Sequence, residues 1–582
     1  MDEKPKGIWK KSWTGWRGFL LWFILFFVIF LFGLVVASTN LPFAWLFAIG
    51  FALAGVILIA SIRWLRRLRN FKRFLFDVAC FATVIALFYA EEDWRGRHDW
   101  EKFKREWEAK GEHFGYASVI PAPVPDDQNF ALTPVIASSY ERFFDKSGHA
   151  VYPRNTNVVD RLTMITWSDN QWAHLPGSGG WQESKKTDLK AWQDFFRSSP
   201  PRGSKETNSF PVAPQPQSPA ADVLLALSKY DSAIEEIRQA SALPDSRFPL
   251  IYGNGDPAAI LLPHLSALKS AAQTLDLRAL AELQTGQSEM ALADVKLSLR
   301  LADAIRTEPF LISHLVRIAI MNLTLQPVWE GLADHQWSDA QMVELDQALA
   351  KFDFLTDYGV AMRGERACGI GVIEFLRHAH DKPRAYASLF MDSENMLMNN
   401  SIALLFNFAP SGWFYQNELR ICRFETQLNL SLADAENNTV SPKAAWRAGD
   451  AYGKEMSRHL SPYNYLERML LANLTGAVKR FAYAQSSVDL ARVAIALERY
   501  RLAHGEYPES LDALTPQFME NIPHDVIGGQ PLHYRRTDDG QFVLYSVGWN
   551  ETDDGGVVVF TKGHTPSVDI SQGDWVWRYP AK

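Results

Sequence analysis

Three runs of apolar residues stand near the start of the chain, at 18–38, 43–62 and 74–90. The first two carry no charge, and each matches the roughly 20 apolar residues that a transmembrane helix needs. The third run is close to the lower limit of about 17 residues and contains Asp77. The pattern predicts a membrane anchor over 1–90 with three transmembrane helices. The alternative is that the third run lies in the membrane interface as an amphipathic helix.

Lysine and arginine are grouped on one side of these runs. Five precede the first run, six lie between the second and third, and the turn at 39–42 has none. Because positive charges near span ends stay in the cytoplasm, the N-terminus is predicted to be cytoplasmic and the chain after Glu91 extracytoplasmic. We expect a bacterial inner (cytoplasmic) membrane protein with most of its chain in the periplasm. If the third run does not span, the bulk of the chain is cytoplasmic instead.

The region 91–197 is aromatic and mixed in pattern. Near its start, aromatic residues recur at near-helical spacing, which predicts a juxtamembrane helix over 91–111. This stripe is expected at the lipid headgroups or on the next domain; its members are Trp94, Trp100, Phe103 and Trp107. The rest of the region is rich in tryptophan. A proline- and serine-rich linker over 198–219 follows, which predicts an extended or disordered segment.

From 220 to 485 the pattern is almost continuously helical. Within it, 276–306 resembles one tetratricopeptide unit, because small or apolar residues stand where two antiparallel helices would touch. These residues are Ala279, Gly286, Ala291, Val295 and Ser298. A second copy about 34 residues later is missing, so we expect an irregular helical domain rather than a repeat array. A capping box, Ser338 to Gln341, starts a further helix.

The last part, 486–582, combines helical and strand patterns. Val488–Leu502 is apolar around most of its circumference, and the helical pattern continues back toward Tyr465. Alternating residues on both sides of Asp539-Gly540 predict a hairpin, and a last strand carries Trp575 and Trp577. The fold class expected for the whole chain is mainly α, with transmembrane helices, an extracytoplasmic helical domain and a small C-terminal α+β module.

Within this module, 486–556 resembles the globular domain of type II secretion major pseudopilins. The matching residues, in order, are Leu497, Tyr500, Gly505, Tyr507, Pro508, Leu511, Leu514, Pro523, Asp525, Gly529, Pro531, Tyr534, Tyr545, Ser546 and Gly548. The chain departs from the family at Val526, where proline is usual. It also lacks the family's processing site, since no glutamate follows Gly18-Phe19. We therefore do not expect a processed pilin subunit.

The resemblance also implies a metal. Major pseudopilins bind calcium in the loop after the hairpin, and the matching loop here offers hard oxygen ligands from Asn550, Glu551, Asp553 and Asp554. A calcium ion at this loop would be structural. The alternative is a solvated acidic turn.

Composition adds little about chemistry. The net charge of −7 gives no basic surface for nucleic acid. Of three cysteines, Cys80 lies in the third apolar run, where we expect it to pack. Cys368 and Cys422 could form a disulfide in an oxidising compartment, or they could be buried free thiols.

No catalytic residue can be assigned, because HExxH, Walker A and GxSxG patterns are absent and His378 and His380 stand only two positions apart. We therefore expect a non-enzymatic structural or interaction protein of the cell envelope, in a secretion or surface-assembly setting, with the lipid bilayer and other envelope proteins as partners. The alternatives are a hydrolase-like envelope enzyme with a site around Glu365 to Asp381, or a glycan-binding module that uses the Trp-rich region before the linker.

Overall fold

The structure, a computed structural model, describes residues 68–137, 176–177, 179–198, 210–250, 260–390, 406–471, 474–562 and 567–580, with a few isolated positions elsewhere. The apolar runs at 18–38 and 43–62 lie outside the described residues. The chain divides into two compact units, Met1–Trp94 and Arg95–Lys582. The fold is mainly helical with small antiparallel sheets toward the C-terminus, as the sequence predicts.

Helix α4, Leu68–Glu108, is one uninterrupted helix. It contains both the third apolar run and the predicted juxtamembrane helix, which we expected to be separate. Residues 75–88 are exposed on all sides of the helix, and the thiol of Cys80 is exposed with them rather than packed. Farther along, Trp100 and Phe103 are buried among other aromatic side chains. Trp100 and Phe103 therefore pack on the folded body, which is one of the two expected positions of the stripe, while Trp94 is 67 % exposed.

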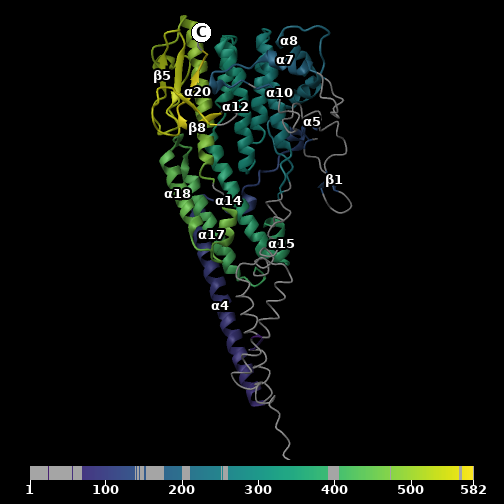
Figure 1. Cartoon of the computed structure of the whole chain (residues 1–582), viewed down its shortest axis with the longest axis vertical. Helices are drawn as coiled ribbons and strands as arrows, with labels where there is room; N and C mark the ends of the chain where they lie inside the picture. The colour runs from purple at the N-terminus through teal and green to yellow at the C-terminus, as the bar shows by residue number, and fades with distance from the viewer. Residues whose placement is uncertain are drawn as a thin grey trace, which may run out of the picture. The chain divides into compact units, whose positions relative to one another are not determined.

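The second unit is built mostly from helices (Figure 1). The helices are α5 (Pro134–Ala137), α7 (Leu189–Arg197), α8 (Pro219–Leu227), α9 (Asp231–Ala240), α10 (His264–Gln284), α11 (Ser288–Asp303), α12 (Leu311–Ala333), α13 (Asp339–Leu349), α14 (Phe354–His378), α15 (Lys382–Phe390), α17 (Ser411–Phe424), α18 (Pro442–Ser457), α19 (Tyr465–Leu470) and α20 (Ala477–His504). A π-helix, Glu425–Asn429, extends α17.

Helices α10 and α11 form the hairpin that the tetratricopeptide-like pattern predicts. Gly286 takes a positive φ of 77° in the turn, which a residue with a Cβ rarely adopts. The small and apolar residues of the pattern are buried where the two helices pack, and α12 covers the pair. The capping box of Ser338 and Gln341 is present at the start of α13.

Helix α12 lies at the centre of this unit. By length and composition it could cross a membrane. Most of it is covered by neighbouring helices, and the side chains of His314 and Arg317 are fully buried within the fold. Both side chains have protein partners there, so we interpret α12 as the core helix of a folded domain.

The C-terminal strands pack against α20 (Figure 1). Three of them form an antiparallel sheet in the order β5-β6-β9, and two more, β7 and β8, form a separate antiparallel pair. The strands are β5 (His533–Arg536), β6 (Phe542–Ser546), β7 (Val558–Phe560), β8 (Val568–Gly573) and β9 (Trp575–Arg578). Gly540, with φ 75°, turns the chain between β5 and β6, as the Asp-Gly hairpin signal predicts.

One hydrophobic core runs from Phe130 to Tyr579 and includes both α12 and the β5-β6-β9 sheet. Helix α20 supplies much of it, because most residues from Val478 to Glu498 are buried. The sequence pattern predicted that this helix continues back to Tyr465, and this prediction was wrong. Helix α19 ends at Leu470, and α20 begins at Ala477. Residue 486 lies inside α20.

Candidate functional site

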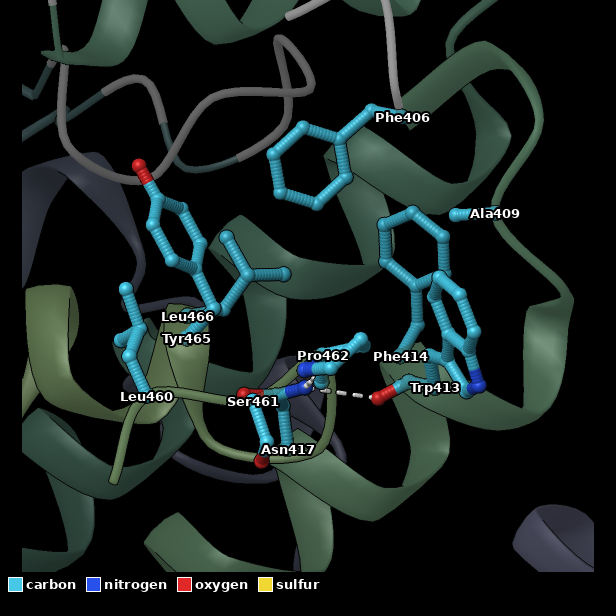
Figure 2. A pocket seen from close by; sticks show the side chains of 10 residues that line it. All are labelled: Phe406, Ala409, Trp413, Phe414, Asn417, Leu460, Ser461, Pro462, Tyr465 and Leu466. Carbon is cyan, nitrogen blue, oxygen red and sulfur yellow. Dashed lines mark hydrogen bonds between the residues drawn. The ribbon is translucent and has the colours of Figure 1, made fainter. Parts of the chain in front are cut away.

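A cavity of about 280 Å³ lies beside α17 and α19 (Figure 2). Its walls come from the residues just before α17, the first turns of α17 and α19, and the loop that precedes α19. The lining is mostly apolar and aromatic. It consists of Phe406, Ala409, Trp413, Phe414, Asn417, Leu460, Ser461, Pro462, Tyr465 and Leu466.

Helical spacing on α17 explains one wall. Trp413 and Asn417 are four residues apart, so their side chains lie on the same face of the helix, and Phe414 stands beside them. Pro410, which precedes the helix, has an extended ψ of 144° and ends the preceding segment. The hydroxyl of Tyr465 lies 2.6 Å from the hydroxyl of Tyr386, so this lining residue also has a polar partner.

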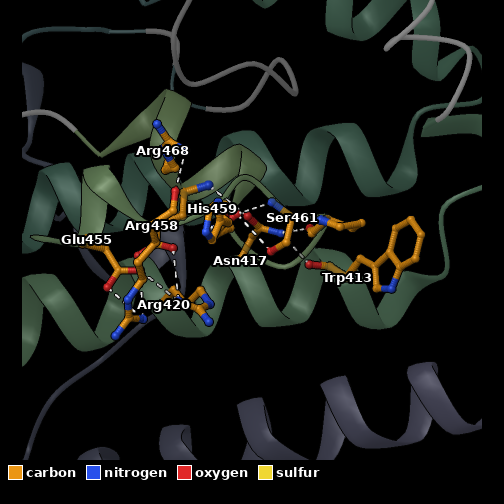
Figure 3. A network of polar contacts seen from close by, with 11 residues as sticks. Trp413, Asn417, Arg420, Glu455, Arg458, His459, Ser461 and Arg468 are labelled. Carbon is orange, nitrogen blue, oxygen red and sulfur yellow. Dashed lines mark hydrogen bonds and ion pairs between the residues drawn. The ribbon is translucent and has the colours of Figure 1, made fainter.

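Asn417 connects the two helices beside the cavity (Figure 3). Its amide nitrogen donates to the carbonyls of Trp413 at 2.7 Å and Pro462 at 2.8 Å. Its side-chain oxygen accepts the backbone N–H of Glu467 at 2.9 Å, at the start of α19. Because these bonds use both ends of the amide, Asn417 holds the wall in place and leaves an apolar surface toward the cavity.

Arginines gather next to the cavity loop (Figure 3). Arg458 lies two positions before Leu460 and pairs with Glu455 at 3.0 Å. Arg420 pairs with the same carboxylate at 2.9 Å and lies 3.7 Å from Glu467. Arg468 donates to the carbonyl of Arg458 at 3.1 Å.

These groups leave an excess of positive charge. Burial is the main cause that raises the pKa of Glu467 to about 7, although Arg420 and neighbouring arginines lower it. Glu467 is therefore partly neutral near pH 7, and Glu455 is the main negative group facing the arginines. The cluster of Arg420, Arg458 and Arg468 is suited to an anion.

Large apolar side chains are exposed around the same segments. Leu460 is 60 % exposed, Phe408 73 % and Met469 40 %. Their chain neighbours line the cavity or build α19. A cavity bordered by exposed apolar residues is typical of a binding surface rather than of a sealed core.

The cavity walls also touch the part of α4 that belongs to this unit. A Cβ on Gly96 would come within 2.3 Å of the carbonyl oxygen of Gly412, so the two backbones are in close contact. The guanidinium of Arg95 donates to the hydroxyl of Tyr463 at 3.3 Å and lies over its ring. Two residues that line the cavity are direct chain neighbours of these contacts: Trp413 follows Gly412, and Pro462 precedes Tyr463.

The region from Glu365 to Asp381 covers the second half of α14 and the residues just after it. Glu365 accepts the backbone N–H of Leu311 at 3.0 Å, and burial raises its pKa. His378 and His380 are exposed. The carboxylate and imidazole groups of this region do not converge on the cavity.

Arg366, in the same region, is fully buried. Its guanidinium donates to Glu112 at 2.7 Å, to Thr426 at 2.7 Å and to the carbonyl of His113 at 3.0 Å. Arg363 pairs with Glu112 at 2.7 Å as well. The sequence could not predict Glu112 as the partner of Arg366, because no pattern near Glu112 indicates a contact with α14.

A second buried polar group surrounds Glu308. His264 lies 2.7 Å from one carboxylate oxygen, and the hydroxyl of Ser313 donates to the other. His314 contacts the carbonyl of Glu308 at 2.9 Å, and burial, with Arg317 nearby, lowers its pKa to about 4. The carboxylate stands between the serine and His264, which differs from a nucleophile–base–acid order.

Two of the four residues predicted to bind calcium contact each other, and the other two have further partners. Asn550 donates to Asp554 at 2.9 Å, Glu551 lies 3.5 Å from Lys443, and Asp553 accepts from Tyr545 at 3.0 Å. Among the described residues, no group of three or more histidine, cysteine, aspartate or glutamate side chains is placed to hold a metal ion. Calcium binding by Asn550, Glu551, Asp553 and Asp554 stays a prediction from the resemblance.

The three cysteines are free thiols. Cys422 is fully buried beside Trp100 and Leu419, and burial raises its pKa well above the usual range. Burial likewise raises the pKa of Cys368, to about 12. Neither thiol is therefore activated as a nucleophile. Their pairing in an oxidising compartment stays a prediction.

The tryptophans before the linker give no platform for a sugar where they are described. Trp181 and Trp192 are buried in the main core, while Trp167 and Trp172 lie outside the described residues.

A more open cavity of about 470 Å³ lies beside α18, next to Trp446, which is 73 % exposed. No pattern in the sequence singled out Trp446.

No protein-family model, curated protein sequence or solved structure matches this chain. The function is therefore inferred from the geometry of the described residues. The cavity beside α17 has no converging acid, base or metal ligands among its lining residues, and its apolar walls and adjacent arginines can hold an apolar chain that carries an anionic group.

Proposed function

We propose that this chain is a membrane-anchored structural and interaction protein of the cell envelope. The exposed apolar surface of α4 carries the proposal. Residues 75–88 present leucine, isoleucine, valine and phenylalanine around the whole helix, a surface that water disfavours and that a bilayer covers. With the two uncharged runs before it, this helix would anchor the protein.

The positive-inside rule supports the orientation. The N-terminus is cytoplasmic and the folded body, from Arg95 onward, lies in the periplasm of a bacterial inner membrane. The large hydrophobic core of that body, with smaller clusters beside it, makes it a rigid platform, and the pseudopilin resemblance of 486–556 favours a secretion or surface-assembly setting. Other envelope proteins are the proposed partners.

An accessibility experiment tests the orientation. Trp446→Cys puts a thiol on an exposed site, and Ser12→Cys puts one before the first apolar run; both are made with the three native cysteines changed to serine. In intact spheroplasts a membrane-impermeant maleimide should label Trp446→Cys at once and Ser12→Cys only after lysis. The reverse pattern would place the body in the cytoplasm.

Site-specific photocrosslinking in cells tests the interaction role. A photoreactive amino acid at Trp446 or Glu436, both exposed, should give discrete protein adducts. The same amino acid at the buried Trp329 is the control and should give none. Absence of adducts from several exposed positions would contradict the interaction role while leaving the anchoring intact.

The cavity favours binding over catalysis. A hydrolase needs carboxylate or imidazole groups that converge on a substrate, and the described cavity beside α17 is lined instead by aromatic and aliphatic side chains.

A further inference from the structure

We propose that the cavity beside α17 and α19 binds one acyl chain of an anionic membrane lipid, whose charged group lies at Arg458 and Arg468. The inference deepens the proposed function and rests on its anchoring part, because the membrane supplies the lipid.

The size and lining of the cavity fit an acyl chain. An apolar cavity of about 150 Å³ is enough to bind benzene, and this one is about 280 Å³. The wall residues Phe414 and Leu466 are each about 1 % exposed, so the wall belongs to the packed core. Both N–H groups of the Asn417 amide donate to backbone carbonyls, so the amide has no donor left for an anionic or carbonyl group of a ligand.

The charge next to the cavity fits an anionic headgroup. Arg458 and His459 directly precede Leu460, Ser461 and Pro462 in the sequence, and these three line the cavity. The side chain of Arg458 is mostly exposed and shares Glu455 with Arg420, so it can also reach a second anion. A phosphate group would bind these guanidinium groups through charge-assisted hydrogen bonds.

The position of the cavity in the sequence fits access from a bilayer. Only residues 91–95 separate the end of the third apolar run from Gly96, whose backbone touches Gly412 beside the wall. Leu460 lines the cavity and is 60 % exposed, and the exposed Phe408 and Met469 belong to the chain segments that form its walls, so an apolar chain can enter beside Leu460. A water-soluble ligand would not require such an apolar entrance.

The test uses the full chain in nanodiscs of phosphatidylcholine that contain a small share of phosphatidylglycerol with a diazirine on one acyl chain. After irradiation, mass spectrometry locates the labelled peptides. We expect label on two separate peptides, 406–414 and 460–466. Label on 75–88 reports whether α4 is in the bilayer, independently of the cavity.

Two variants address the cavity and one addresses the charge. Leu460→Asp places a carboxylate at this apolar entrance and should reduce the cavity label by about tenfold or more. Ala409→Phe fills the cavity and should do the same. Because Leu460 is exposed, its variant should fold even if Ala409→Phe does not. Arg468→Glu should reduce label from phosphatidylglycerol but not from a phosphatidylcholine probe. Trp446→Ala is the control and should leave all labels unchanged.

Each outcome decides the matter. Label on 75–88 without label on the cavity peptides, or cavity label that Leu460→Asp leaves unchanged, overturns the lipid site and leaves the anchoring intact. Equal labelling by both lipids in the parent chain overturns the headgroup assignment. Absence of all label contradicts the anchoring and the lipid site together. Protection of the cavity peptides by a bound protein instead of lipid assigns the cavity to a partner and overturns the proposal.

Discussion

The buried guanidinium of Arg366 donates to the carboxylate of Glu112 at 2.7 Å, although the two residues are 254 positions apart in the sequence. This bond joins the middle of α14 to the segment that follows α4. Burial raises the pKa of Glu112, but hydrogen bonds from Arg363 and Arg366 outweigh it and keep the pKa below its usual value. Glu112 thus stays ionised and neutralises a cation that has no access to water.

Glu112→Ala should destabilise the folded body by about 3–5 kcal/mol, because it leaves Arg366 buried without a counter-ion. Thermal and urea unfolding of the purified full chain measure the change. Glu108→Ala is the matched control; its contact with Lys104 is 3.9 Å long and exposed, and should contribute less than about 1 kcal/mol. Equal losses in the free energy of unfolding for the two substitutions would show that the buried ion pair contributes no more stability than the exposed one.

Glu418→Gln should make stability less dependent on pH. Burial is the main cause that raises the pKa of Glu418 from 4.5 to about 8, while Arg377 lowers it. Because the pKa of Glu418 is higher in the folded state, its contribution to stability is fully present below about pH 4.5 and is lost as the pH rises through about 8. At pH 9 the free energy of unfolding of the neutral amide variant should therefore exceed that of the parent by on the order of a few kcal/mol. At pH 4 the two proteins should be equally stable. The exposed Glu436→Gln should change stability at neither pH; a parent stability that rises between pH 5 and pH 9 in step with Glu418 ionisation would contradict the assignment.

Gly96→Ala should weaken the packing of α4 on α17. Its Cβ would stand 2.3 Å from the carbonyl oxygen of Gly412, which is backbone and cannot move aside cheaply. We expect a loss of about 1–3 kcal/mol in unfolding experiments. Gly453→Ala in α18 is the control, because its Cβ meets no atom within 4 Å and alanine favours a helix by about 1 kcal/mol. The two substitutions should thus have opposite signs, and stabilisation by both would refute the close contact.

Asp574→Ala should loosen the acidic loop before β7. The carboxylate of Asp574 accepts the backbone N–H groups of Asp554 at 3.2 Å, Gly556 at 2.6 Å and Val557 at 3.2 Å. Losing these acceptors should cost on the order of 1–3 kcal/mol and increase hydrogen exchange at these amides. Lys443→Ala removes only the exposed contact with Glu551 and should leave the exchange rates unchanged. Unchanged exchange in Asp574→Ala would show that the loop is held by other contacts.

Local patterns predicted the fold well where they depend on neighbours in the sequence. The hairpin at Gly540, the capping box at Ser338 and the helix pair at Gly286 are all present. The prediction of one helix reaching back to Tyr465 was wrong, because α19 ends at Leu470 and α20 begins at Ala477. The partner of Arg366 could not be predicted, because Glu112 lies far away in the sequence.

The candidate site could not be predicted in the same way. Its walls come from residues 406–417 and 460–466, and no motif marks either segment as binding. The calcium ligands expected from the resemblance, Asn550, Glu551, Asp553 and Asp554, stay a prediction.

The sequence by itself determined where the apolar runs, helices and turns lie, because periodicity, caps and glycine conformations act over a few residues. Only the tertiary structure decided which buried charge meets which partner and where an apolar cavity remains. The physical reason is that both depend on side chains from distant segments packing around a shared space, and a linear pattern holds no record of those distances.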